Sequence, residues 1–330
     1  MGLLNVFSGK KATEHDPTEG RAFILEASDA ARVQDWEEVT SLYRQIPTAS
    51  DKYAWLHTLS RMLPIALDLP TEAETSDLAC ILAELHTNRG FRIRGGETAD
   101  RVETNAFFDM RDCLHIAEKL VLQAEAASPE DSVPTIIHFN IALGLSADEN
   151  AVDDIQKKYH ACSEQSVFAP SNLLMLRTEK WLGSRDEMWA VATNYTEAPP
   201  NSAWYALRAK ALIEDSLWFS AFEDDQDAIK SYRQLRRDGT LQEELKAIES
   251  KFWEGLETST PPASEKLFAH NHFAWILYQF GMKEDARRHF EVIGPTLTYQ
   301  PWCYSFPPDE NPIASLNKIR KRLSLPPFLA

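Results

Sequence analysis

Signals that start α-helices recur along this chain at short intervals, and they constrain its fold more than any other feature. The stretches TEAE (71–74) and SRDE (184–187) both spell a capping box, in which a hydroxyl side chain and a glutamate three residues later satisfy free N–H groups of a first helical turn. Apolar residues follow at three- and four-residue spacing, which is typical of amphipathic helices. The alternation of Val, Thr and Ile that marks strands is nearly absent. These patterns predict an all-α protein.

The predicted helices come in antiparallel pairs joined by short turns. The stretch FAWILYQFGMKEDARRHF (273–290) has the spacing of a tetratricopeptide repeat, in which small residues let two helices approach and large residues fill the space beside them. Its matching positions are Ala274, Leu277, Gly281, Ala286 and Phe290. Other units are degenerate, so we expect an irregular tetratricopeptide-like helix-pair solenoid. Helices are predicted at residues 18–32, 36–46, 51–67, 72–88, 104–127, 134–145, 149–164, 171–181, 185–197, 202–219, 225–237, 240–255, 265–280, 283–292 and 313–323.

We expect the chain to divide into three parts. Residues 1–16 are predicted to be a flexible or loosely docked N-terminus, and 17–297 the helical array. Residues 298–330 are predicted to be a strap rich in proline and aromatic residues, followed by a basic helix, both packed on the array. Prolines in the strap prevent it from being helical throughout.

The net charge of −16 limits the possible partners. Such a protein repels nucleic acid and anionic membrane surfaces, whereas it attracts a basic protein. No apolar run approaches the roughly 18 residues of a membrane span. Cys80, Cys113, Cys162 and Cys303 lack CxxC spacing, so neither a zinc ribbon nor a redox motif is predicted, and unpaired cysteines suit the cytoplasm. We expect a cytoplasmic protein with no nucleic-acid or membrane partner.

The stretch KWLGSRDEMW (180–189) is interpreted as the turn between two helices and not as a catalytic loop. Trp181 would end the first helix, and Gly183 would take the left-handed conformation that follows a helix. Ser184 would cap the second helix, with Glu187 in its first turn and Met188 on its buried face. Lys180 completes this structural motif.

The same stretch carries a resemblance. Together with several looser matches, KWLGSRDEM (180–188) resembles a bacterial tetratricopeptide-like family catalogued only as a domain of unknown function, whose members show a Lys-Trp-x-Gly-Ser-x-x-x-Met element. The looser matches are RG (89–90), ETADRV (97–102), SPED (128–131), ALGL (142–145) and APPNS (198–202). The likeness covers roughly residues 25–215; residues 89–96 depart from it in being longer and more basic. The resemblance implies the fold and no established activity, so it supplies no catalytic residue.

An arginine-rich loop at 89–101 is the sharpest candidate binding site. Arg89, Arg92, Arg94 and Arg101 form a cationic island in an acidic chain, and guanidinium groups suit phosphate or carboxylate. The competing interpretation is that these arginines pair with acids of the same chain.

The histidines suggest no metal site. His270 and His272 are two apart, so they diverge on a helix, and no third ligand is evident. Asp285 and His289 are interpreted as a surface pair. The other helical histidines, His86, His115, His138 and His160, are expected in packing or surface roles.

We therefore expect a non-catalytic module that binds an unidentified protein or peptide, with no cofactor and no metal. A basic partner fits the charge, and neutralisation of a toxin is one form that this binding would take. The alternative is a small-anion sensor or enzyme that uses the arginine-rich loop 89–101.

Overall fold

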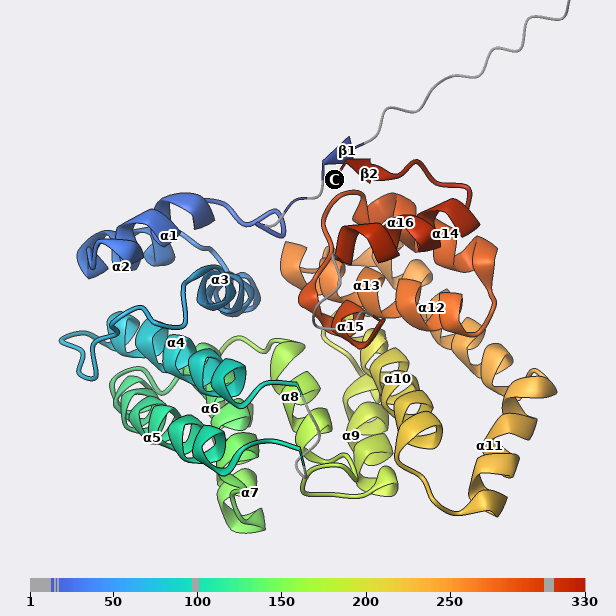
Figure 1. Cartoon of the computed structure of the whole chain (residues 1–330), viewed down its shortest axis with the longest axis horizontal. Coiled ribbons are helices and arrows are strands. Elements are labelled where there is room, and N and C mark those ends of the chain that lie inside the picture. Colours follow the sequence, from blue (N-terminus) through green and yellow to red (C-terminus); the bar gives the residue numbers. More distant parts are fainter. Residues whose placement is uncertain (1–12, 15, 17, 97–100, 306–311, 330) are drawn as a thin grey trace, which may run out of the picture.

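The computed structural model describes residues 13–14, 16, 18–96, 101–305 and 312–329, and nearly all of its regular structure is helical (Figure 1). The prediction of an all-α protein is confirmed, and each stretch predicted to be helical overlaps an observed helix. The α-helices are α1 (Ile24–Arg32), α2 (Trp36–Arg44), α3 (Ala49–Met62), α4 (Ser76–Arg94), α5 (Thr104–Ala127), α6 (Ser132–Leu145), α7 (Glu149–Ala161), α8 (Phe168–Leu176), α9 (Arg185–Glu197), α10 (Ala206–Ala221), α11 (Gln226–Arg237), α12 (Thr240–Thr258), α13 (Ala263–Gln279), α14 (Lys283–Ile293), α15 (Tyr299–Trp302) and α16 (Pro312–Arg322). Two 3-10 helices, η1 (Ser202–Tyr205) and η2 (Cys303–Ser305), and two short strands, β1 (Thr13–Glu14) and β2 (Phe328–Leu329), accompany them.

Five helices form a closed ring in the middle of the molecule. α3 contacts α6, α6 contacts α8, α8 contacts α10, α10 contacts α13, and α13 returns to α3. Outer helices such as α1, α7, α11 and α14 pack around this ring (Figure 1). Because the ring helices are covered on several sides, most of their positions are apolar or small, as in SVPTIIHFNIALGL (132–145) of α6.

Side chains from opposite members of the ring fill its interior. Tyr53 of α3 packs against Phe168 of α8 with ring centroids 5.1 Å apart, and Phe168 packs against Phe268 of α13 at 5.6 Å. The Tyr53 hydroxyl accepts hydrogen bonds from Asn140 of α6 at 3.0 Å and from Asn172 of α8 at 3.3 Å. These contacts cross the ring, so its centre is packed with side chains.

A buried carboxylate joins α13 to α3 where the ring closes. Glu265, at the start of α13, is 1% exposed. Its Oε1 accepts hydrogen bonds from Ser50 Oγ at 2.6 Å and the Val167 N–H at 3.0 Å, and its Oε2 accepts one from Asn201 at 2.8 Å. Burial raises the pKa of Glu265. Three donors on one buried carboxyl fix the relative positions of four segments.

The first and last described segments of the chain pair with each other. β1 pairs in parallel with β2, with Thr13 opposite Phe328. Asn317 of α16 holds the second strand, because its side chain donates to the Phe328 carbonyl at 3.0 Å and accepts from the Phe328 N–H at 2.7 Å. The strand before the first helix therefore lies beside the strand after the last helix.

Two helices begin later than the sequence predicts. The helix expected at 18–32 starts at Ile24, because Asp16 accepts hydrogen bonds from the N–H groups of Thr18 and Gly20 and holds residues 18–20 in a turn. The capping box at 71–74 does not start a helix either. α4 starts at Ser76, with the Thr75 hydroxyl as its N-cap.

The helix hairpin that the repeat spacing predicts at 273–290 is present. Gly281 has a φ of 80° in the turn between α13 and α14, and Ala274 and Ala286 are both 0% exposed. Residues 299–305 cross α13, where the Trp302 indole donates to Asn271 Oδ1 at 2.7 Å. The division of the chain after residues 16 and 297 stays a prediction. Within the described part of the chain, no helix is both long and apolar enough to cross a membrane.

Candidate functional site

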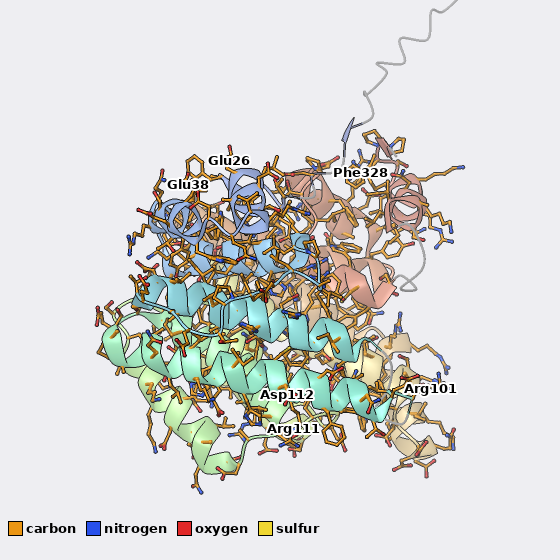
Figure 2. The ribbon with its side chains drawn as sticks, turned by 60° about the vertical axis from the view of Figure 1, so that its left-hand side comes forward. Glu26, Glu38, Arg101, Arg111, Asp112 and Phe328 are labelled. Atoms are coloured by element: carbon orange, nitrogen blue, oxygen red, sulfur yellow. The ribbon has the colours of Figure 1, made fainter. Side chains whose placement is uncertain are left out.

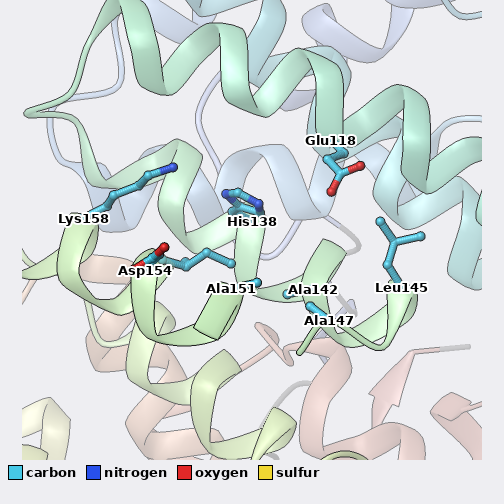
Figure 3. A pocket seen from close by; sticks show the side chains of 9 residues that line it. Glu118, His138, Ala142, Leu145, Ala147, Ala151, Asp154 and Lys158 are labelled. Atoms are coloured by element: carbon cyan, nitrogen blue, oxygen red, sulfur yellow. The ribbon is translucent and has the colours of Figure 1, made fainter. Parts of the chain in front are cut away.

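A pocket of about 210 Å³ opens between α5, α6 and α7 (Figure 3). Small and apolar residues make up most of its wall, and a few charged residues surround them. The lining residues are Glu118, His138, Ala142, Leu145, Ala147, Ala151, Asp154, Ile155 and Lys158. This hollow is the α5–α7 pocket.

The local sequence explains why alanines face the α5–α7 pocket. α6 ends at Leu145, and Ser146 follows in a left-handed conformation with a φ of 56°. Asp148 then starts α7 by accepting a hydrogen bond from the Ala151 N–H at 2.9 Å. The α7 residues of the lining are three or four apart, so they share one face of the helix. Alanine on that face leaves space that a longer side chain would fill.

His138 lies in the middle of the pocket wall, with Lys158 and Asp154 to one side and Glu118 to the other (Figure 3). Its Nδ1 is 2.8 Å from Glu125 Oε1, and Lys158 Nζ is 2.6 Å from Glu125 Oε2. Burial raises the pKa of Glu125, but the bonds to His138 and Lys158 outweigh burial and lower this pKa overall. Because an ionised carboxylate only accepts, the hydrogen bond to Glu125 requires a proton on Nδ1 of His138.

Two other carboxylates at the pocket are held loosely. The Glu118 side chain is 40% exposed, and its ion-pair partner is the exposed His115 at 3.5 Å. Asp154 is exposed and pairs with Lys157 at 2.9 Å, which lowers the pKa of Asp154. Pairs this exposed contribute little to stability.

The pocket has an excess of negative charge. Three carboxylates, of Glu118, Glu125 and Asp154, face two ammonium groups, of Lys157 and Lys158. The sum over these carboxylates and ammonium groups is one negative charge. The lining contains no Ser, Thr or Cys that could act as a nucleophile. The arrangement therefore suits binding of one small cationic group.

The arginine-rich stretch is not the loop that the sequence predicts. Arg89, Arg92 and Arg94 lie in the last turns of α4. Gly90 continues this helix and lets it pack closely on α5, because a Cβ at that position would meet the Met110 carbonyl oxygen at 3.0 Å.

Arg89 and Arg92 bind main-chain carbonyl groups outside α4. Arg89 Nη1 donates to the Leu67 carbonyl at 3.1 Å. Arg92 Nη1 donates to the carbonyls of Ser60 at 2.9 Å and Leu63 at 2.8 Å. Ser60 and Leu63 lie at the end of α3, where carbonyl groups lack helical partners. Arg92 therefore caps α3.

The other two arginines lie at the end of α4 and shortly before α5. Arg94 donates to the Gly95 carbonyl at 3.1 Å, and its guanidinium lies 5.6 Å from the centre of the Phe107 ring. Arg101 is exposed at the start of the segment before α5 (Figure 2). Residues 97–100, which fall within the predicted loop, lie outside the described residues.

Residues 177–184 form the turn between α8 and α9 that the sequence predicts. The Ser184 hydroxyl caps α9, because it accepts from the Glu187 N–H at 3.3 Å and donates to Glu187 Oε2 at 2.7 Å. Met188 is 2% exposed and faces the core. The half-buried Trp181 packs against the same core.

The prediction of a left-handed Gly183 is wrong. Gly183 is not among the residues with positive φ. α8 already ends at Leu176, five residues before Trp181, and the turn folds back against that end. A Cβ on Gly183 would lie 2.5 Å from the Arg177 carbonyl oxygen. This close approach is why glycine is needed there.

The charged residues of the same motif bind two neighbouring acids on α10. Lys180 Nζ forms an ion pair with Glu214, whose Oε1 also accepts from the Tyr304 hydroxyl at 3.2 Å. Arg185 pairs with Asp215 at 2.8 Å. Glu214 and Asp215 are 4% and 2% exposed. The motif therefore attaches the α8–α9 turn to the ring.

Lys210 lies one turn before these acids and is also buried. Its Nζ donates to Ser171 Oγ at 2.8 Å, and burial lowers the pKa of Lys210 to about 8. A serine beside a lysine of lowered pKa is the geometry of a nucleophile and its base. Both side chains are 3% exposed and neither lines the α5–α7 pocket, so this pair is assigned to the core.

The interpretation of Asp285 and His289 as a surface pair is wrong. His289 is 0% exposed, and its Nδ1 lies 2.8 Å from His270 Nδ1. Its Nε2 lies 3.2 Å from Glu249 Oε1. Since Glu249 accepts the Nε2 proton, His289 Nδ1 accepts from His270 Nδ1. Burial lowers the pKa of His270 to about 3.

Neither the placement of metal-binding side chains nor comparison with known proteins assigns a further site to the chain. Within residues 18–96, 101–305 and 312–329, no three His, Cys, Asp or Glu side chains are placed to share a metal ion. No family model, no curated protein and no solved structure matches the chain. The resemblance to a tetratricopeptide-like family therefore stays a prediction.

Proposed function

We propose that this chain is a non-catalytic binding module, built as an irregular tetratricopeptide-like array, that holds a basic protein or peptide in the bacterial cytoplasm. The observation that carries the proposal is the distribution of charge. Several cationic side chains are bound by groups of the protein itself, while the chain carries an excess of acidic side chains, many of which are exposed.

The cations with internal partners come from several elements. Arg89 and Arg92 donate to main-chain carbonyls, and Lys180 and Arg185 pair with buried acids on α10. These side chains are not available to bind an anionic partner. Exposed acids such as Glu26 and Glu38, which project from α1 and α2, keep the surface negative (Figure 2).

A net charge of −16 then favours a basic partner, because electrostatic complementarity accelerates encounter and disfavours partners of like charge. Neutralisation of a basic toxin is one form that such binding would take. The alternative, a small-anion sensor or enzyme at Arg89–Arg101, has less support because three of its arginines already have main-chain partners.

The binding surface is the outside of the array. Open helical-repeat arrays present a concave groove to their ligands. Here α13 contacts α3 and the Tyr53, Phe168 and Phe268 rings fill the centre. A partner must therefore contact the outer helices.

The test uses the immobilised full chain and a lysate of the cells that encode it. Proteins retained at about 0.15 M NaCl and released at about 0.5 M are identified, expressed separately and titrated by calorimetry. We expect a basic protein that binds in a defined ratio and at least about tenfold more weakly at the higher salt. Failure of every purified candidate to bind, or binding of an acidic protein without salt dependence, would contradict the proposal.

A further inference from the structure

We propose that the α5–α7 pocket binds one lysine or arginine side chain of the basic partner. This inference rests on the proposed function, because it names the group by which that partner is recognised.

The size of the pocket favours a single side chain. Pockets that hold drug-sized ligands enclose roughly 300–1,000 Å³. The α5–α7 pocket encloses about 210 Å³, which excludes a nucleotide or an organic cofactor but accommodates one long side chain.

The shape of the wall matches an aliphatic stem. Leu145, Ala147, Ala151 and Ile155 form an apolar surface from the end of α6 along α7. Lysine and arginine bury their methylene groups on such surfaces while the charged end reaches polar groups. A short cation would leave this surface uncovered.

The polar groups of the pocket match a cationic end. Glu118 and Asp154 offer exposed carboxylates whose partners, His115 and Lys157, are exposed as well. Lys158 does not cancel them, because its ammonium group is bound to Glu125 at 2.6 Å. One added positive charge would bring the pocket to neutrality.

An anionic side chain fits less well. To pair with Lys158 it would have to replace the bond between Lys158 and Glu125, and it would lie near the carboxylates of Glu118 and Asp154. These two carboxylates would repel an anionic side chain in the pocket.

The test observes the pocket directly by methyl NMR of the full chain labelled with ¹³C at alanine methyl groups. The methyl groups of Ala142, Ala147 and Ala151 report on the pocket, and all other alanines report on the remaining surface. The probes are the Nα-acetyl methylamides of lysine, arginine, norleucine and glutamate, each added at constant ionic strength. Norleucine has the stem of lysine without its charge.

We expect saturable shifts of these three methyl groups with the lysine or arginine probe, and at least about fivefold weaker binding of norleucine and glutamate. Glu118→Gln should weaken the cationic probe about tenfold. Ala151→Leu should abolish the shifts of the remaining pocket methyls by filling the space, and because Ala151 is exposed this variant does not disturb the core. Glu257→Gln and Ala190→Leu, at exposed positions on α12 and α9, are the matched controls and should bind as the unaltered protein does.

Equal binding of norleucine, preferred binding of glutamate, or shifts spread evenly over surface alanines would overturn the inference. If the probes fail but a purified basic partner still binds in calorimetry, the pocket assignment falls and the proposed function stands. If the probes bind selectively but no basic partner does, the pocket assignment stands and the proposed function falls.

Discussion

The acids on α10 and the acids of the α5–α7 pocket are the same residue types used in opposite ways. Glu214 and Asp215 are almost fully buried, and each accepts from more than one donor. The Glu118 side chain is 40% exposed, with an imidazole at 3.5 Å as its partner. Buried pairs hold the fold because loss of one partner leaves an uncompensated charge, whereas exposed carboxylates stay available. The exposure of each acid and the number of its hydrogen-bond donors distinguish the acids that hold the fold from the acid that we propose binds the partner. The negative charge alone does not distinguish them.

The largest expected effect of a single substitution is on the buried side of this comparison. Glu214→Gln removes the charge that Lys180 pairs with and leaves that ammonium group without its partner. We expect a loss of about 3 kcal/mol in the free energy of unfolding, measured by urea denaturation. Glu179→Gln, at an exposed position in the same turn as Lys180, is the control and should change stability by less than about 0.5 kcal/mol. A loss below about 1 kcal/mol in Glu214→Gln would mean that the α10 acids do not hold the motif.

Acid should also act strongly, through buried histidines. Burial lowers the pKa values of His270 and His272 to about 3, whereas unfolded histidine titrates near 6.5. Below pH 6.5 the unfolded chain binds protons that the folded chain does not, so stability falls as the pH drops from about 6.5 towards 3. Two such histidines change the free energy of unfolding by roughly 3 kcal/mol per pH unit. Burial raises the pKa of Glu265. Protonation of this carboxyl therefore increases the free energy of unfolding as the pH falls, which opposes the effect of the histidines.

Urea denaturation at pH 7, 6 and 5 measures this slope. His115→Gln should leave it unchanged, because the side chain of His115 is 51% exposed. Equal stability at pH 7 and pH 5 would show that the buried histidines are already protonated in the folded protein.

Gly183 tests how tightly the α8–α9 turn is packed. Gly183→Ala places a Cβ 2.5 Å from the Arg177 carbonyl oxygen, so we expect a loss of about 2 kcal/mol, measured by urea denaturation. Gly96→Ala is the control, since a Cβ there has nothing within 4 Å and its φ is not positive. Similar stabilities of the two variants would contradict the assignment of Gly183 to close packing.

Arg92 tests whether the arginine-rich stretch is structural. Arg92→Ala removes two hydrogen bonds to carbonyls at the end of α3, for which we expect a loss of about 1–2 kcal/mol in chemical denaturation. Arg111→Ala, at an exposed position on α5, should cost less than about 0.5 kcal/mol. Stabilisation of the unaltered protein by phosphate-bearing metabolites, lost in Arg92→Ala, would instead favour the small-anion alternative.

Local signals in the sequence predicted the helices well. The bounds at 104–127 and 185–197 agree with α5 and α9, because Ser128 and Pro129 follow the end of α5 and Ser184 caps the start of α9. Errors occurred where a competing local bond intervened. Asp16 holds a turn that delays α1, and Thr75 replaces Thr71 as the cap of α4.

Tertiary partners could not be predicted in the same way. His138 and Glu125 are 13 residues apart, and only the turn between α5 and α6 brings them together. Ser50 and Glu265 are 215 residues apart, so closure of the ring left no local signal. The arginines of α4 looked like a ligand site because their partners are main-chain carbonyls, which no side-chain pattern reveals.

The smallest expected change in stability belongs to the pocket, and Glu118→Gln is the most direct test of the whole comparison. Unfolding in urea and titration with the lysine probe are measured on the same variant. The account predicts stability within about 0.5 kcal/mol of the unaltered protein together with roughly tenfold weaker binding of the probe. A large loss of stability with unchanged binding would contradict it, because Glu118 would then belong with the buried acids of α10.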